Sequence, residues 1–179
     1  MIKSRIQIEN GTIYDFESMF GFVQISSDNI LAAPIKAFEQ TSNPEKSGVN
    51  ILPLTVEDTF DYKVKFFVSA KGGLENANWK IAEFNDAITT KISDDTDIKR
   101  IKQITFYNDY KKVKIVGYPT PISNATEFWR DLKGKQHDVV CVELTIKVTE
   151  PSLCNFNIDS EEYEAFYVKS EAFYVKKSK

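Results

Sequence analysis

The amino-acid sequence predicts a mainly β, α+β domain: an antiparallel β-sandwich or split barrel with one packed α-helix at about residues 74–90. Two long segments alternate apolar and polar residues, the period of two that a strand with one buried face requires. One further segment has its apolar residues at helical spacing. Aromatic residues make up 13% of the chain, and they favour sheets and interfaces over helix bundles.

The clearest strand covers residues 139–148 and ends at Glu150-Pro151, because proline has no N–H to donate to a neighbouring strand. A second strand of the same kind covers residues 60–70. In each, one set of alternating apolar residues is expected to face the core: Val140, Val142, Leu144, Ile146 and Val148 in the first, and Phe60, Tyr62, Val64, Phe66 and Val68 in the second.

Shorter strands are expected before these two. Residues 2–8 alternate and form a first strand, and Asn10-Gly11 is a strong hairpin pair because both residues tolerate a positive φ. The return strand is expected at residues 12–16, and a third strand at residues 20–25.

The one predicted helix follows Gly72-Gly73 and has its apolar stripe on Leu74, Ala77, Ile81, Phe84 and Ile88. A polar turn at residues 93–97 comes next. Strands at residues 101–107 and 110–116 then flank Asn108-Asp109, the pattern of a hairpin. The connection at residues 117–136 is predicted to contain a helical turn around 126–132.

Residues 26–48 form a long loop or extended arm, with Pro34, Pro44 and Gly48 spread along it. Loops of this length inside a compact domain are uncommon and often serve binding. A short strand is expected at residues 49–56, placed at a sheet edge or bulge by Pro53.

Composition excludes several classes of protein. The formal net charge of -3 argues against a general nucleic-acid binder. No apolar run approaches the roughly 20 residues that cross a bilayer, and the first residues do not resemble a signal peptide. We therefore expect a soluble protein made in a cytoplasm, with Cys141 and Cys154 as buried thiols and no disulfide.

No cluster of residues predicts catalysis, a metal or another cofactor. His137 and Asp138 are neighbours on a strand, so their side chains point to opposite faces. Asp94, Asp95 and Asp97 lack the glycine and the distal glutamate of an EF-hand loop. The lysines of the second hairpin are expected on a solvated face: Lys111, Lys112 and Lys114.

The C-terminal residues contain a short duplication. Glu164–Lys169 (EAFYVK) recurs as Glu171–Lys176, with Ser170 as the spacer. Two copies are too few for a solenoid. We expect a domain at residues 1–157 and a tail at residues 158–179, and the alternative for the tail is a β segment that pairs with another chain.

The order of these parts resembles the N-terminal domain of phage distal tail proteins and, more loosely, the tail-tube fold they share. In that family a strand precedes a helix, and the chain then enters a hairpin carrying an aspartate and tyrosines, here Phe106–Tyr110. The final strand often ends in an acid-proline pair before an aromatic residue, here Glu150-Pro151 before Phe156. The resemblance covers residues 1–157.

The sequence departs from that pattern in two places. Members often have a glycine-rich segment before the long strand, whereas this chain has Asn43–Gly48. Larger members add a carbohydrate-binding-like domain, which the short tail cannot supply.

The resemblance implies a structural role and no enzyme activity. Copies would join edge to edge into a ring, expected to be hexameric, where the tail tube meets the baseplate, and would contact other tail and baseplate proteins. The protein would belong to the virion tail and be assembled in the bacterial host cytoplasm, without a membrane or a specific nucleic-acid sequence as partner. The interface is expected on the arm and the hairpin, at Pro34, Ile35, Phe38, Pro44, Tyr107 and Tyr110.

Two other hypotheses belong to different classes. One is a carbohydrate- or ligand-binding β-sandwich module, in which Trp79 and Trp129 would stack on a ligand. The other is a hydrolase with an unrecognised site around Asp58, Asp61 or His137.

Overall fold

The computed structural model describes residues 3–35, 40–42, 49–51, 57–70, 73–93, 97–125, 127–130 and 136–158. Two α-helices and one 3-10 helix lie among the strands, at α1 (Phe16–Phe20), α2 (Leu74–Ala87) and η1 (Pro151–Leu153). The strands are β1 (Ser4–Ile8), β2 (Ile13–Asp15), β3 (Phe22–Ser27), β4 (Gln40–Ser42), β5 (Val49–Ile51), β6 (Phe60–Ser69), β7 (Thr89–Lys91), β8 (Lys99–Ile101), β9 (Ile104–Asn108), β10 (Val113–Pro119), β11 (Glu127–Arg130) and β12 (Gln136–Val148).

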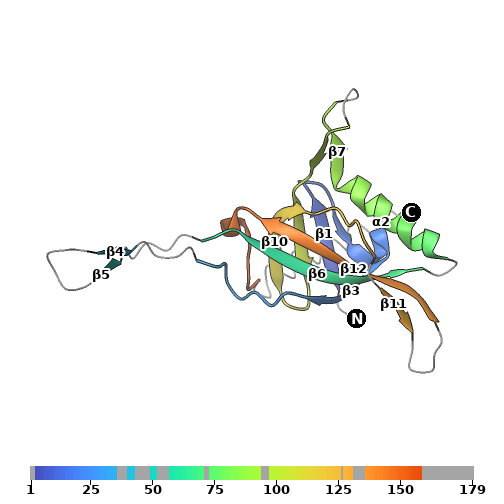
Figure 1. Ribbon diagram of the computed structural model, residues 1–179, viewed down its shortest axis with the longest axis horizontal. Helices are drawn as coiled ribbons and strands as arrows, with labels where there is room; N and C mark the ends of the chain where they lie inside the picture. The colour runs from blue at the N-terminus through green and yellow to red at the C-terminus, as the bar shows by residue number, and fades with distance from the viewer. Residues whose placement is uncertain are drawn as a thin grey trace.

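One antiparallel sheet of eight strands forms the body of the molecule (Figure 1). Its path is β2-β1-β9-β10-β12-β6-β3, and β11 pairs with β12 beside that path. The two halves of the path face each other across the core, since the rings of Phe66 on β6 and Phe106 on β9 lie edge to face with centroids 6.4 Å apart. Among the described residues the end strands β2 and β3 do not pair with each other. The predicted α+β, mainly β class is confirmed, and the sheet does not close into a barrel among the described residues.

The two long strands predicted from alternation form the centre of the sheet. β12 and β6 pair without interruption from Val139 opposite Ser69 to Val148 opposite Phe60. Their predicted inner residues are buried except Phe60, which is half-buried. Burial of such side chains contributes roughly 1.5–3 kcal/mol each to folding, so this pair anchors the core.

Helix α2 covers the core with Ala77, Ile81 and Phe84. Two details of its prediction are wrong. Leu74 is 43% exposed although it lies on the predicted stripe, because it is the first residue of the helix. The helix ends at Ala87 and not at residue 90, because the β-branched Thr89 and Thr90 enter β7, which pairs with β8. This small two-stranded sheet was not predicted.

The short helix α1 was also missed, since Phe16 and Phe20 were assigned to strands. Asp15 Oδ1 accepts the Ser18 N–H at 2.8 Å, which caps the helix N-terminus. Gly21 ends it with φ 70°, and its N–H donates to the Glu17 carbonyl. Both phenylalanines are buried, one helical turn apart. The N-terminal cap and the burial of these two side chains therefore stabilise a helix where the residue pattern predicted strands.

Two further predictions on the second half of the chain need correction. Residues 127–130 form strand β11, hydrogen-bonded to β12, and not part of a helical turn at 126–132. The second strand of the Asn108-Asp109 hairpin begins at Val113 and not at Tyr110, because the turn includes Lys112 with φ 53°. The hairpin itself is confirmed.

The predicted arm contains a small two-stranded sheet. β4 pairs with β5, and Figure 1 shows this pair standing apart from the main sheet. The strand predicted at residues 49–56 is described only at residues 49–51. Residues 159–179, which include the duplicated segment, lie outside the described residues.

The thiols of Cys141 and Cys154 are not joined by a disulfide, as predicted, but both are half-buried and not buried. Of the helices in the described part of the chain, none has the length and apolar character needed to cross a membrane.

Candidate functional site

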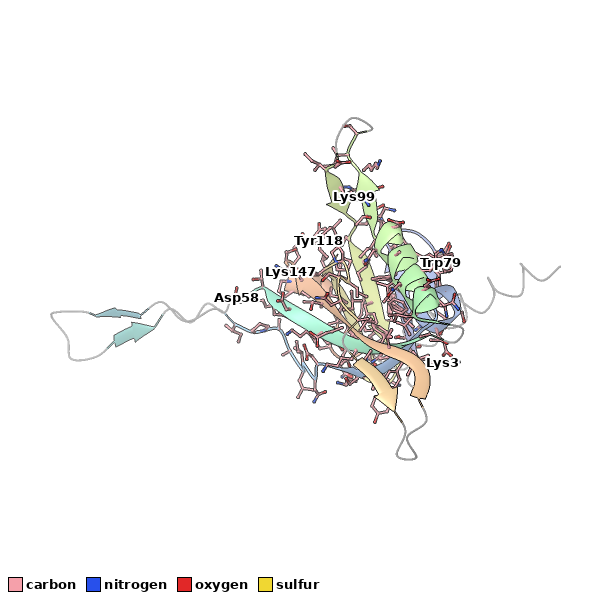
Figure 2. The ribbon with its side chains drawn as sticks, turned by 45° about the vertical axis from the view of Figure 1, so that its right-hand side comes forward. Lys3, Asp58, Trp79, Lys99, Tyr118 and Lys147 are labelled. Atoms are coloured by element: carbon pink, nitrogen blue, oxygen red, sulfur yellow. The ribbon has the colours of Figure 1, made fainter. Side chains whose placement is uncertain are left out.

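The root of the arm contains two of the predicted interface residues, Pro34 and Ile35. After β3 the chain runs through residues 28–35 to an isolated antiparallel bridge between Ile35 and Glu57. The Asp58 N–H donates to the Pro34 carbonyl at 2.7 Å. The outgoing and returning chains are therefore joined at the arm's base, beside the start of β6, where Figure 2 labels Asp58.

A lysine from the second hairpin binds the start of the segment that leads to this root. Lys111 Nζ donates to the carbonyls of Ser27 at 2.7 Å and Asp28 at 2.9 Å. Asp28 is also tied to β6, because its N–H donates to the Lys63 carbonyl at 2.9 Å and its Oδ2 accepts the Lys63 N–H at 2.8 Å. The expectation that Lys111 lies on a solvated face is wrong, since its ammonium group binds backbone carbonyls.

Buried polar side chains stabilise the turn that presents Lys111. Asn108 is 1% exposed, and its Nδ2 donates to Ser27 Oγ at 2.9 Å and to Tyr62 Oη at 3.5 Å. Its Oδ1 accepts the Lys111 N–H at 3.0 Å. Burial raises the pKa of the Tyr62 phenol, and its hydrogen bonds with Ser27 and Asn108 offset part of that rise.

The other side of the turn is held by Arg5. Its guanidinium forms an ion pair with Asp109 at 3.0 Å and lies 5.4 Å from the centre of the Tyr107 ring. Tyr107 is 3% exposed, so its ring belongs to this chain's own packing. Tyr107 was predicted to lie at an oligomer interface, but its buried ring is not available to a partner.

Four exposed residues lie on the segment at residues 28–35 and on the hairpin turn that contacts its start, and we call them the arm-root surface: Leu31, Pro34, Ile35 and Tyr110. Leu31 is 79%, Ile35 53% and Tyr110 73% exposed. Tyr110 is adjacent to Lys111, which binds the start of the same segment. Of the other predicted interface residues, Phe38 and Pro44 lie outside the described residues. Leu31 was not among the predicted interface residues, although it belongs to the apolar residues of the predicted arm.

An open strand edge lies next to this surface. β3 pairs with β6 on one side, and no strand of the described chain pairs with its other side. A bulge between Gln24 and Ser26 interrupts its register. Gln24 is 5% exposed and its Oε1 has no hydrogen-bond partner. The edge leaves backbone donors and acceptors available for pairing with another chain.

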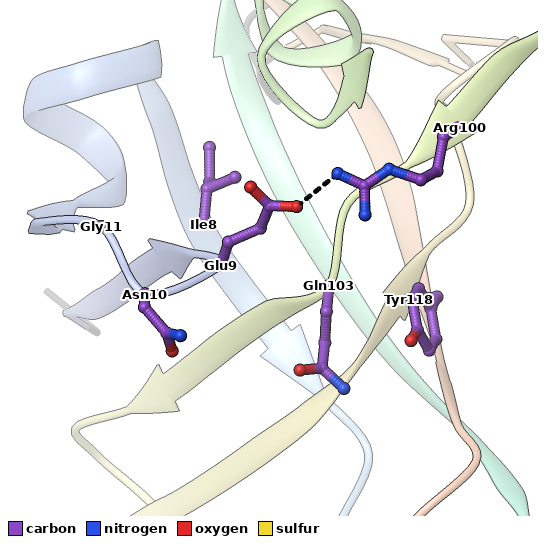
Figure 3. A pocket seen from close by; sticks show the side chains of 7 residues that line it. All are labelled: Ile8, Glu9, Asn10, Gly11, Arg100, Gln103 and Tyr118. Atoms are coloured by element: carbon purple, nitrogen blue, oxygen red, sulfur yellow. Dashed lines mark hydrogen bonds and ion pairs between the residues drawn. The ribbon is translucent and has the colours of Figure 1, made fainter. Parts of the chain in front are cut away.

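A separate polar depression of 610 Å³ lies where the β1–β2 turn meets β8 (Figure 3). It is lined by Ile8, Glu9, Asn10, Gly11, Arg100, Gln103 and Tyr118. The ion pair from Glu9 Oε1 to Arg100 Nη2, 2.8 Å long, crosses it. Its charged groups thus neutralise each other, and it holds no cysteine, serine or histidine that could serve as a nucleophile or base.

Of the proposed hydrolase residues, the structure describes the side chains of Asp58 and Asp61. Asp58 Oδ1 accepts the N–H of Thr59 at 2.8 Å, Asp61 is exposed on β6, and the side chain of His137 lies outside the described ones. Within the described ranges, no three His, Cys, Asp or Glu side chains are grouped so as to hold a metal ion.

Comparison with known proteins leaves the family open. No protein-family model matches this sequence, and no curated protein matches it. Among solved structures, the chain is similar to the Dit protein (gp 19.1) of phage SPP1, described as a paradigm of the hub adsorption apparatus in phages that infect Gram-positive bacteria. The identity is 15% and the TM-score 0.49, with 83% of this chain and 50% of that chain covered. The chain thus spans half the length of that protein, and a likeness this distant carries no argument about function.

Proposed function

We propose that this protein is a structural component of a phage tail or a tail-like particle. Copies join through sheet edges and the arm into a ring, with six copies expected, at the junction of tail tube and baseplate. The arm-root surface supports this proposal most directly. Several large exposed apolar side chains on a segment that is hydrogen-bonded to the body at both ends are consistent with a protein–protein contact.

The described fold also supports the family resemblance of the sequence. β6 precedes helix α2, the hairpin β9–β10 follows with Asp109 in its turn, and β12 leads into η1 at Pro151. The residues at which the sequence departs from the family pattern, 43–48, lie outside the described ones. On this proposal the protein is not an enzyme; it belongs to the virion tail and is assembled in the host cytoplasm.

Ring formation needs two different surfaces on each copy that fit each other. The β3 edge and the arm-root surface are two such surfaces on this proposal: the edge pairs with backbone groups of the neighbour, and the arm-root surface packs on apolar side chains of the neighbour. On this proposal the arm of one copy lies across its neighbour, and other tail and baseplate proteins bind the assembled ring.

The test is the mass of the full chain in solution by light scattering over a wide concentration range. We expect a closed oligomer near six copies, and its loss in the double variant Ile35→Asp/Tyr110→Asp. The matched control is Ile92→Asp/Ile98→Asp, at positions 64% and 62% exposed just beyond the paired ends of β7 and β8, which should leave the mass unchanged. A monomer at every concentration would contradict the ring and favour a ligand-binding module, which saccharide-dependent quenching of tryptophan fluorescence would then test.

A further inference from the structure

The polar depression beside the β1–β2 turn contains none of the residues proposed for the ring. Its walls come from separate parts of the chain: the turn itself, strand β8, the segment between β8 and β9, and strand β10 (Figure 3). Its volume of 610 Å³ lies within the range of about 300–1,000 Å³ that small-molecule sites occupy. Such sites are usually lined mainly by apolar side chains. Most of the residues that line this one are polar, so the ligand that fits it is polar too.

Hydrogen bonds between neighbouring walls hold the shape of this depression. The Glu9 N–H donates to the Gln103 carbonyl at 2.8 Å, which ties the turn to the segment before β9. The Gly11 carbonyl accepts Gln7 Nε2 at 2.8 Å. Glu9 has φ 53°, in the left-handed region that residues other than glycine rarely adopt, and this turn brings its carboxylate to 2.8 Å from Arg100 Nη2. A site whose walls are already in place loses little conformational freedom when a ligand binds.

Three side chains of the depression carry polar groups that the fold itself does not use. Among the described residues, no hydrogen bond joins the amides of Asn10 and Gln103 or the hydroxyl of Tyr118 to another group. Each amide offers donors and an acceptor side by side, and a hydroxyl group donates and accepts at one atom. The two amides therefore match a ligand that is rich in hydroxyl groups.

The charges of the depression cancel each other. Glu9 and Arg100 are the acidic and the basic residue among those that line it, so it favours neither an anion nor a cation. Their ion pair uses one carboxylate oxygen and one guanidinium nitrogen. The second oxygen and the other N–H groups remain available to ligand hydroxyls, and hydrogen bonds to charged groups are stronger than those between neutral groups.

Tyr118 adds an aromatic ring to this polar surface. It is 38% exposed on the outer side of β10, between the buried residues Gly117 and Pro119. An exposed tyrosine ring offers an apolar face beside a polar tip. A sugar ring has the matching pattern, because its C–H groups form an apolar face and its hydroxyls lie around the edge. A peptide segment is bound more typically along a strand edge, whereas these groups surround one compact depression.

We propose that this depression binds a neutral saccharide. The sugar ring stacks on Tyr118, the amides of Asn10 and Gln103 bind its hydroxyl groups, and the Glu9–Arg100 pair binds further hydroxyls at the opposite wall. A monosaccharide held by these few contacts should have a Kd on the order of 1 mM. The binding does not depend on ring formation.

The test measures saturation transfer by NMR from the full chain to dissolved sugars, which detects weak binding to a monomer and to a ring alike. The neutral probes are glucose, galactose and N-acetylglucosamine. We expect transfer to at least one of them, and Tyr118→Ala should raise its Kd about three- to tenfold, since the stacked contact is lost. The matched control Trp79→Ala removes an aromatic ring that is 66% exposed on α2, and it should leave the Kd unchanged.

Two charge variants test the site independently of Tyr118. Arg100→Gln leaves the Glu9 carboxylate without its counter-charge, so binding should shift from glucose toward glucosamine, which carries an ammonium group. Glu9→Gln leaves the guanidinium alone and should shift binding toward glucuronate. The Arg100 and Glu9 side chains are 57% and 44% exposed, so neither substitution should prevent folding.

Several results would overturn this site. One is the absence of transfer to every neutral probe at concentrations well above the expected Kd. Another is a Kd that Tyr118→Ala leaves unchanged or that Trp79→Ala raises, because the sugar would then bind elsewhere. Charge variants that do not change the order of preference, or stronger transfer to the neutral peptide analogue N-acetylglycinamide than to any sugar, would also contradict it. Light scattering on the same samples reports the ring separately, so either proposal can fail alone.

Discussion

Arg5 and Asp109, 104 residues apart in the sequence, form a buried ion pair in which Asp109 Oδ1 receives both Nε at 3.1 Å and Nη2 at 3.0 Å. Their side chains are only 5% and 7% exposed. The pair joins the first strand to the turn that presents Tyr110 and Lys111. In the sequence Asp109 is only an aspartate in a hairpin turn. In the fold it joins this turn to the first strand through Arg5.

Replacing one member of this pair should be costly. We expect Asp109→Ala to lower the free energy of unfolding by about 3–5 kcal/mol, because it leaves the Arg5 guanidinium buried without its counter-charge. Urea denaturation measures the change. The control is Glu143→Ala, whose carboxylate is 39% exposed and lies 3.8 Å from Lys63; it should cost at most about 1 kcal/mol. Equal costs for the two variants would contradict a buried, structural pair.

Gly117 allows β10 to approach β12 at the joint between the two halves of the sheet. A Cβ at this position would lie 2.4 Å from the Lys147 carbonyl oxygen and 2.9 Å from Ile146 Cγ2. We expect Gly117→Ala to lower the free energy of unfolding by about 1–3 kcal/mol, because the strands must separate to admit the methyl group. Thermal and urea denaturation check this. Gly11→Ala, with one contact at 3.0 Å in a surface turn, is the control and should cost less.

Lys111 is expected to control how firmly the arm is rooted. Lys111→Met keeps the aliphatic stem and removes the donors to the Ser27 and Asp28 carbonyls, at a cost of about 1–2 kcal/mol. The larger effect should be local: faster hydrogen exchange at the amides of Asp28 and Lys63, which hydrogen-bond each other's residues. Lys114→Met serves as the control for loss of a nearby lysine. Unchanged exchange at both amides would show that β6 alone holds the root.

The long-range pattern of the fold was predictable, and its short elements were not. Strict alternation identified β6 and β12 because each is buried on one face along its length. The three-residue strands β7 and β8 have too few residues to show a period. Helix α1 has only one turn, and its signals, Asp15 before the helix and Gly21 after it, were visible but weaker than the alternation around them.

The sequence indicated several exposed residues of the candidate site, but not the hydrogen bonds that hold the site to the rest of the fold. Pro34, Ile35 and Tyr110 were selected as apolar residues in an arm and a turn, and all three are exposed, the first two at the arm's root and the third in the turn beside Lys111. No sequence pattern indicates that Lys111 binds the carbonyls of Ser27 and Asp28, because lysine–carbonyl bonds across more than 80 residues have no local signal. For the same reason the burial of Tyr107 against Arg5 was missed.

Tyr62 should make the stability of the fold fall at alkaline pH. Burial raises its pKa in the folded protein above the ordinary value of 10.0. Above that value the unfolded chain loses the phenolic proton while the folded chain retains it. The folded state then binds more protons than the unfolded state, so its stability is fully present below pH 10 and falls as the pH rises toward the folded pKa.

The measurement compares the original protein with Tyr62→Phe by urea denaturation at several pH values from 8 to 11. At pH 8 the variant should be less stable by about 1 kcal/mol, since Asn108 loses an acceptor. Above pH 10 this difference should shrink, by at most about 1.4 kcal/mol per pH unit, because phenylalanine has no proton to lose. Tyr110→Phe, at a 73% exposed position, controls for the loss of a phenol. Parallel pH profiles for the original protein and Tyr62→Phe would show that the buried phenol does not contribute to alkaline unfolding.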